Sequence, residues 1–146
     1  MKQVKDAMTP NPKVISSDTT VADAAQQMRK LHTGSLLIGN EERLQGFITD
    51  RDVVVRLVAE GNDAENTEVG EIMTEKVLYC FEDDPITDCA ENMRQNEITR
   101  LVVLNRDKRL VGIVSHGDLA QCALKHNIQQ EIGQTVAEIA AQHKAA

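Results

Sequence analysis

The first half of the chain alternates apolar and polar positions in a regular order of elements. Residues 13–16 predict a short strand, and the hydroxyl and carboxylate side chains of residues 17–20 can cap a following helix. The apolar positions of that helix recur at the i, i+3, i+4, i+7 spacing, at Val21, Ala24, Ala25 and Met28. This stripe predicts a helix with one buried face.

Two apolar runs and a second helix complete the unit. Residues 35–38 and 44–48 are apolar and are separated by the polar turn 39–42, which predicts a β-hairpin. Residues 50–59 place valines and a leucine on one side of a helix, and Gly61 is a plausible stop. The order is therefore strand, helix, strand, strand, helix.

The same order returns 65 to 66 residues later. Met-Thr at positions 8–9 returns at 73–74, and Gly-x-x-Thr-x-x-Asp at 46–52 returns at 112–118 with Ser in place of Thr. A short duplicated unit rarely buries its own apolar face, so we expect the two copies to pack together.

We predict repeats at residues 1–60 and 69–125, joined by a polar link. A tail at residues 127–144 carries an apolar stripe at Ile128, Ile132, Val136 and Ile139. It predicts a C-terminal helix that covers an apolar surface, either in its own chain or on a second copy.

Composition excludes several classes of protein. The net charge of −7, from 23 acidic and 16 basic residues, offers no basic surface for nucleic acid. The chain shows neither a membrane span nor a secretory leader, so the expected location is the cytoplasm. Three cysteines without close spacing fit a reducing compartment. Aromatic residues make up only 2%, so a planar ligand would be held by aliphatic side chains and backbone.

The repeated hydroxyl and carboxylate residues lie where a strand ends and a helix begins. Thr49 with Asp52, and Ser115 with Asp118, offer a hydroxyl for phosphate and a carboxylate for ribose beside unpaired helix amides. The same spacing also fits a capping box that only satisfies those amides. Two matching copies make a nucleotide site and a cap about equally plausible.

Taken together, these repeated motifs resemble a tandem pair of CBS domains, or Bateman module, like the small stand-alone bacterial proteins of that family. The resemblance covers about residues 1–125. It implies an α/β fold of two pseudo-symmetric βαββα repeats plus a C-terminal helix. It also implies clefts between the repeats that bind AMP, ADP, ATP or S-adenosylmethionine, with Asp52 and Asp118 on ribose and Thr49 and Ser115 near phosphate.

The resemblance also assigns residues of the opposite repeat to each cleft. They are Met8, Lys13 and Val14 for the motif at 112–118, and Met73, Leu78 and Tyr79 for the motif at 46–52. Arg100 matches an arginine that contacts phosphate in several family members, and its counterpart is Ser35, so the two sites differ. Arg51 and His116 lie inside the motifs and are further candidates for phosphate, although either side chain is also compatible with plain solvation.

The chain shows no catalytic constellation, so the sequence predicts a regulatory ligand sensor rather than an enzyme. We expect no required cofactor and no resident metal, a homodimer, and a signal read by a second chain or by a protein partner. Two alternatives remain: a structural dimerisation module with empty clefts, and a metal or redox sensor that uses Cys80, Cys89 or Cys122. The identity of the nucleotide and of the occupied cleft stays open.

Overall fold

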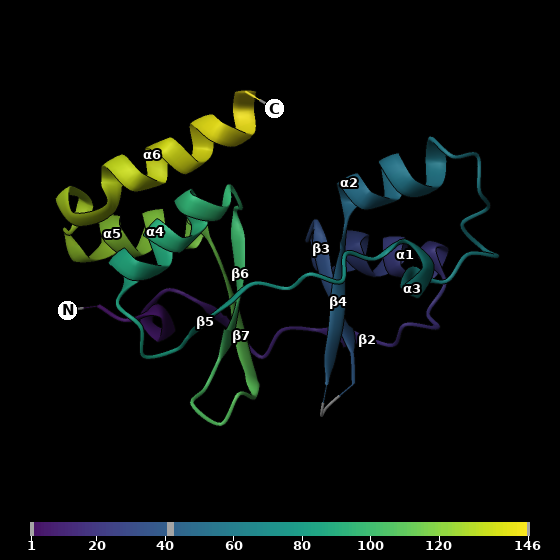
Figure 1. Ribbon diagram of the computed structural model, residues 1–146, viewed down its shortest axis with the longest axis horizontal. Helices are drawn as coiled ribbons and strands as arrows, with labels where there is room; N and C mark the ends of the chain where they lie inside the picture. The colour runs from purple at the N-terminus through teal and green to yellow at the C-terminus, as the bar shows by residue number, and fades with distance from the viewer. Residues whose placement is uncertain (1, 41–42, 146) are drawn as a thin grey trace. The chain divides into compact units, whose positions relative to one another are not determined.

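The predicted strand, helix, strand, strand, helix order forms in both repeats of the computed structural model, which describes residues 2–40 and 43–145 (Figure 1). In the first repeat the elements are β2 (Val14–Ile15), α1 (Val21–Leu31), β3 (Ser35–Gly39), β4 (Leu44–Thr49) and α2 (Asp50–Val53), which continues into η2 (Val54–Val58). In the second they are β5 (Tyr79–Phe81), α4 (Ile86–Asn96), β6 (Arg100–Leu104), β7 (Leu110–Ser115) and α5 (His116–His126).

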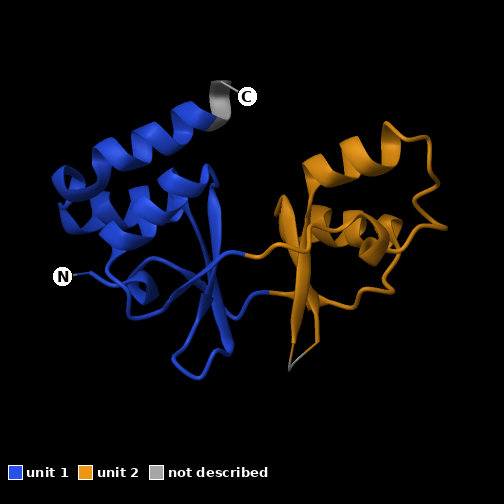
Figure 2. Ribbon diagram, viewed as in Figure 1, with its two compact units in different colours: residues 1–12, 78–146 blue, residues 13–77 orange. Residues whose placement is uncertain are grey.

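The chain divides into two units that do not follow the boundaries of the repeats. Unit 1 contains residues 1–12 and 78–146, and unit 2 contains residues 13–77 (Figure 2). The segment that opens each repeat therefore belongs to the unit built around the other repeat.

Unit 2 has a three-stranded mixed sheet in the order β2-β3-β4, parallel between β2 and β3 and antiparallel between β3 and β4. Thr20 caps α1 by accepting the Asp23 N–H at 3.2 Å, as its hydroxyl predicts, and His32 ends the helix in the left-handed region. The β3–β4 hairpin is confirmed; two residues of its predicted turn, 41–42, lie outside the described residues. A short helix before the end of the unit, α3 (Val69–Ile72), was not predicted.

Unit 1 repeats this arrangement with an additional strand. Its sheet order is β1-β7-β6-β5, in which β1 (Thr9–Pro10) comes from the start of the chain and pairs antiparallel with β7. A short 3₁₀ helix, η1 (Val4–Asp6), precedes β1 and was not predicted either. Pro85 is the N-cap of α4, with extended backbone angles.

The C-terminal tail folds back on its own chain. Helix α6 (Gln129–Ala145) packs against α4 and α5 within unit 1 (Figure 1). Ile132 and Ile139 are 1% and 0% exposed, and Ile128 and Val136 pack on the same cluster. The structure therefore selects the first of the two covers that the sequence left open for this stripe.

The last helix of the first repeat differs from the single helix predicted over residues 50–59. It begins as an α-helix and widens to a π-helix at Val54, where the Ala59 N–H donates to the Val54 carbonyl at 2.9 Å. Three consecutive β-branched valines crowd this turn, which weakens regular α geometry. Gly61 follows with φ +73°, consistent with the predicted stop. Within residues 2–40 and 43–145, no helix has the length and apolar character needed to span a membrane.

Candidate functional site

Both hydroxyl and carboxylate pairs lie at a junction of strand and helix. In unit 2, Thr49 Oγ1 accepts the Asp52 N–H at 3.1 Å, and the Thr49 N–H donates to Asp52 Oδ2 at 2.9 Å. In unit 1, Ser115 and Asp118 exchange the same two bonds at the same two distances. Each pair is therefore a capping box, in which side chains satisfy backbone donors at the helix start.

Capping uses only part of each carboxylate. Asp52 and Asp118 both accept the backbone N–H through Oδ2, so their Oδ1 atoms take no part in the capping bonds. Neither carboxylate is fully buried. A carboxylate offers about four acceptor positions. The capping role and a role in binding hydroxyl donors are therefore compatible in the same residue.

The register of each hairpin decides which side chain stands beside the hydroxyl. Arg100 is directly opposite Ser115 in the β6–β7 pair, whereas Ser35 is directly opposite Thr49 in the β3–β4 pair. Directly opposite residues in antiparallel strands have Cβ atoms about 5 Å apart. Arg100 is exposed, so only unit 1 has a cation next to its strand-end hydroxyl at this position.

The surroundings of the two carboxylates also differ. In unit 2, Arg56 Nε lies 3.8 Å from Asp52 Oδ1, and Arg56 Nη1 donates to the carbonyls of Ile72 and Met73 at 3.0 and 3.1 Å. The equivalent position in unit 1 is Cys122, which is buried. Among the described residues, no cation lies within ion-pair distance of Asp118.

The Met-Thr segment of each repeat packs on the motif glycine of the other repeat. A Cβ on Gly112 would lie 2.5 Å from Met8 Sδ and 2.9 Å from the Thr9 carbonyl oxygen. A Cβ on Gly46 would lie 3.1 Å from Met73 Sδ and 2.5 Å from a backbone carbonyl. Glycine is needed at both positions because the backbone of the second segment approaches so closely. Met8 thus shares a unit with Ser115 and Asp118, and Met73 shares one with Thr49 and Asp52.

The other candidates are distributed between the units. Lys13 and Val14 lie in unit 2, and Leu78 and Tyr79 lie in unit 1, so neither pair shares a unit with the motif to which the resemblance assigned it. Arg51 is exposed in the first turn of α2.

His116 begins α5 directly after Ser115. Its N–H donates to the Thr99 carbonyl at 3.0 Å, and its Nδ1 atom is buried without a hydrogen-bond partner among the described residues. An unsatisfied buried nitrogen beside the motif keeps His116 among the candidates.

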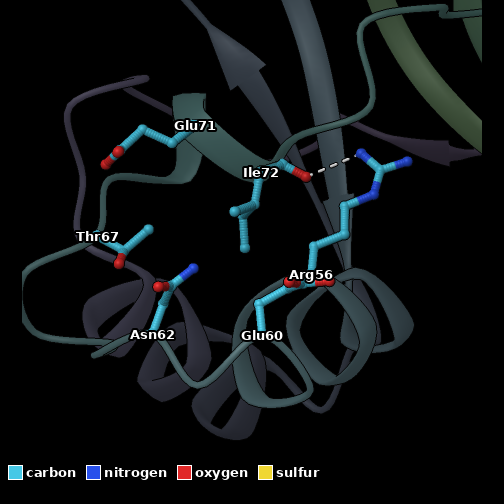
Figure 3. A pocket seen from close by; sticks show the side chains of 6 residues that line it. All are labelled: Arg56, Glu60, Asn62, Thr67, Glu71 and Ile72. Atoms are coloured by element: carbon cyan, nitrogen blue, oxygen red, sulfur yellow. Dashed lines mark hydrogen bonds between the residues drawn. The ribbon is translucent and has the colours of Figure 1, made fainter.

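A pocket of about 390 Å³ lies in unit 2 beside the motif helix. Its lining residues are Arg56, Glu60, Asn62, Thr67, Glu71 and Ile72 (Figure 3). Several of these polar groups already have local partners: Glu71 accepts the Glu68 N–H at 2.7 Å, and Thr67 donates to the Asp63 carbonyl at 2.8 Å. None of the residues predicted for the site lines this pocket.

The three cysteines are buried in unit 1. Cys80 Sγ and Cys89 Sγ are 4.0 Å apart between β5 and α4. The hydrogen bond to Cys80, together with burial, raises the pKa of Cys89, and burial raises the pKa of Cys122. Cys89 and Cys122 are therefore neutral at physiological pH, whereas thiolates are the form that binds metals and reacts. Within the described part of the chain, no three His, Cys, Asp or Glu side chains are grouped to hold a metal ion.

Arg56 is the residue of this region that the sequence reasoning missed. It lies four residues after Asp52, the spacing at which oppositely charged helix side chains meet. That spacing was the available signal. The hydrogen bonds of Arg56 to the carbonyls of Ile72 and Met73 could not be predicted, because no sequence pattern specifies which backbone carbonyl accepts them.

Comparison with known proteins places these features in a family. The sequence profile of the CBS domain matches residues 4–59 and 69–125. The CBS domain-containing protein YhcV of Bacillus subtilis is 34% identical over 120 residues, which cover 82% of this chain and 84% of that protein.

Two further relatives have solved structures. Hypoxic response protein 1 of Mycobacterium tuberculosis is 32% identical over 131 residues, covering 89% of this chain and 91% of that protein. A crystal structure of Hypoxic Response Protein I with two coordinated zinc ions matches with a TM-score of 0.71, covering 83% of this chain and 98% of that one. The crystal structure of CBSX2 in complex with AMP matches with a TM-score of 0.74 at 25% identity, covering 87% of this chain and 99% of that one.

Proposed function

Because the chain belongs to the CBS-domain family as a tandem pair of repeats, we propose that it is a regulatory module that binds an adenosine-containing nucleotide at its two motifs. The observation that carries the proposal is that each motif aspartate caps its helix through Oδ2, so that its Oδ1 atom takes no part in the capping box. The complex of CBSX2 with AMP supports this choice of ligand class.

Each residue type has a role that its chemistry supports. The Oδ1 atoms of Asp52 and Asp118 accept hydrogen bonds from ribose hydroxyls, and the strand-end hydroxyls of Thr49 and Ser115 lie toward the phosphate. Arg100, opposite Ser115, pairs with phosphate through its forked guanidinium. The remaining contacts are proposed for Met8, Met73, Arg51, His116, Lys13, Val14, Leu78 and Tyr79.

The module acts by binding rather than by catalysis. A nucleotide that prefers one arrangement of the chain shifts the population toward it, by no more than its difference in affinity for the two arrangements. A second chain or a protein partner then reads that arrangement.

Thermal unfolding tests the ligand class. AMP, ADP, ATP and S-adenosylmethionine are each added to the purified protein at millimolar concentration, with CMP and UMP as controls. A ligand present at 100 times its dissociation constant adds about 2.7 kcal/mol to the free energy of unfolding. We expect a higher melting temperature with at least one adenosine compound and no change with the pyrimidines. The absence of any shift rejects the proposal.

Calorimetric titration of three variants with the stabilising nucleotide separates binding from capping. Asp52→Asn and Asp118→Asn remove the charge that ribose contacts, and we expect each to weaken one site by about 1.5 to 3 kcal/mol. Glu71→Gln is the matched control, because Glu71 also closes a capping box, at α3, and is not a residue of either motif. Unchanged affinity in both aspartate variants leaves capping as their whole function.

We further propose that two copies associate through the first repeat's last helix. Val54, Val55 and Val58 are 59%, 47% and 64% exposed there, whereas α6 covers the corresponding helix layer of unit 1. Light scattering should show a dimer for the wild type and a monomer for the double variant Val54→Glu, Val58→Glu. Leu124→Glu, at the position of unit 1 equivalent to Val58, should remain dimeric. A monomeric wild-type protein excludes the dimer.

A further inference from the structure

Arg56 joins two parts of unit 2 that are distant in sequence. One guanidinium lies 3.8 Å from the Asp52 carboxylate and donates two hydrogen bonds to the carbonyls of Ile72 and Met73 (Figure 3 draws the bond to Ile72). The side chain is about half exposed, and that of Asp52 is 14% exposed. The motif carboxylate and the backbone of residues 72–73 therefore share a single cation.

The segment held by Arg56 is the exit from unit 2. Helix α3 ends at Ile72, and Met73 continues in extended conformation. Thr74 exchanges two backbone hydrogen bonds with Phe47 on β4, at 2.8 and 3.0 Å. After Val77 the chain enters unit 1. A change in residues 72–74 is thus a change at the point where one unit is connected to the other along the chain.

The helix around Arg56 has an irregular backbone. Arg56 is the middle residue of the π-helix η2 (Val54–Val58), whereas the equivalent helix α5 is regular through His126. Single turns of π-helix occur preferentially at functional sites. The irregular turn thus marks the position of Arg56 independently of its contacts.

The second repeat has no equivalent of this link. Cys122 replaces Arg56 and is buried. The corresponding segment has β-pairing, as Thr74 has, but no arginine at the position of Arg56. Thr9 and Pro10 pair with Ile113 and Gly112 on β7, and the Asn11 N–H donates to the Val111 carbonyl at 3.2 Å.

We propose that Arg56 is a positioning residue that couples occupancy of the Asp52 carboxylate to the backbone of residues 72–74. The inference rests on the proposed function, because the ligand is the nucleotide that binds Asp52. Ribose hydroxyls that donate to Asp52 Oδ1 compete with the Arg56 guanidinium for that oxygen. The same guanidinium donates to the carbonyls of Ile72 and Met73, so losing its contact with Asp52 changes how it holds them. Nucleotide binding at Asp52 therefore changes the backbone of residues 72–74. Binding at Asp118 has no such effect through this position, because Cys122 replaces Arg56 there.

Residue-resolved hydrogen exchange with and without AMP tests the coupling. The amides compared are those of Thr74 in the coupled segment and Thr9 in the uncoupled one, in the wild type, Arg56→Gln and Arg29→Gln. Arg29 is the matched control, because it is an exposed arginine of the same unit, in the last turn of α1, and lies outside both the motif and the carbonyl contacts. Without ligand, exchange at Thr74 should be about tenfold faster in Arg56→Gln, in the range for lost hydrogen bonds to a charged donor.

With AMP, the wild type and Arg29→Gln should change exchange at Thr74 by about fivefold or more, the lower end of coupling between sites. In Arg56→Gln this response should be absent while calorimetry still detects AMP binding, and Thr9 should behave alike in all three proteins. A Thr74 response that persists in Arg56→Gln, or is absent from the wild type with AMP bound at Asp52, overturns the inference. Loss of AMP binding in Arg56→Gln also overturns it, since Arg56 would then belong to the binding site.

Arg56→Lys keeps the experiment decisive if the glutamine variant does not fold. Lysine retains the charge beside Asp52 but lacks the planar fork that reaches both carbonyls. We expect it to lose the Thr74 response as well, and a retained response overturns the inference. If AMP does not bind the wild type at all, calorimetry shows that the proposed function has failed, which is a different result from AMP binding without a Thr74 response.

Discussion

Unit 1 and unit 2 are built from the same five elements, yet they present their helices differently. In unit 1, α6 lies over α4 and α5, so that Ile132 and Ile139 are buried. In unit 2 the equivalent helices have no such cover from the described residues, and three valines of η2 are exposed. The two units therefore differ although their elements are the same. The apolar face of the helices is packed under α6 in unit 1, whereas valines of η2 remain exposed in unit 2.

The same division appears at the motifs. Both capping boxes have identical hydrogen-bond distances, but Asp52 shares its free oxygen with Arg56, while Ser115 has Arg100 across the strand pair. Conserving the cap keeps the helix start intact. The different neighbours give each motif its own electrostatic surroundings.

The largest expected effect is on the free energy of unfolding. It compares a buried side chain in the α6 interface of unit 1 with an exposed side chain on a helix of unit 2. Ile132→Ala removes a fully buried side chain from the α6 interface, and such truncations cost about 2 to 5 kcal/mol of unfolding free energy. Leu31→Ala, at a position of α1 in unit 2 that is 51% exposed and lies outside the proposed dimer helix, should change it by less than about 0.5 kcal/mol. Urea titration of both variants measures the contrast. Equal losses would mean that Leu31 is buried in solution.

Alkaline pH should affect unit 1 selectively, because all three cysteines lie there. The pKa values of Cys89 and Cys122 are raised in the folded protein, so the folded state retains protons that the unfolded chain loses. Their stabilising contribution is complete below about pH 8.5, the ordinary thiol pKa, and is lost as the pH rises above it. The loss reaches about 1.4 kcal/mol per pH unit for each thiol.

Urea titrations between pH 7 and 10 test this dependence. The double variant Cys89→Ala, Cys122→Ala should have a shallower decline in unfolding free energy than the wild type. Identical slopes in the two proteins would show that these thiols ionise as easily in the fold as in the unfolded chain.

The smallest expected effect tests the likeness of the two caps. Thr49→Ala and Ser115→Ala should each cost about 1 kcal/mol, the usual effect of losing an N-cap hydroxyl, and the two costs should agree because the bond distances agree. Thr20→Ala, at the cap of α1, provides the reference. A clearly larger cost at Thr49 would indicate that Arg56 and Asp52 stabilise the first cap beyond its two hydrogen bonds.

The periodic pattern was sufficient to predict the elements of each repeat. The stripes of α1, α4 and α6 and the β3–β4 hairpin are confirmed because their apolar spacing and cap residues are local features. The capping boxes that form at both motifs are one of the two interpretations that the residue spacing left open.

Other features depend on contacts that no local pattern contains. The local pattern of residues 4–10 and 69–77 does not indicate that each segment joins the unit of the opposite repeat. That choice depends on β-pairing between Phe47 and Thr74, which are 27 residues apart, and between Thr9 and Ile113, which are 104 residues apart. The hydrogen bonds from Arg56 to the carbonyls of Ile72 and Met73 could not be predicted from the sequence either. Every residue has a backbone carbonyl, so no residue pattern indicates which two carbonyls accept them.

The exchange of opening segments has a consequence for biosynthesis. Unit 2 is one uninterrupted stretch, residues 13–77, and can fold as soon as it leaves the ribosome, whereas β1 must wait until β7 has been made. Unit 1 is then completed by closing a long loop around an already folded insert, and the entropy of that closure grows only slowly with loop length. The nascent chain thus folds from its middle outward, and its first strand is among the last to find its partner.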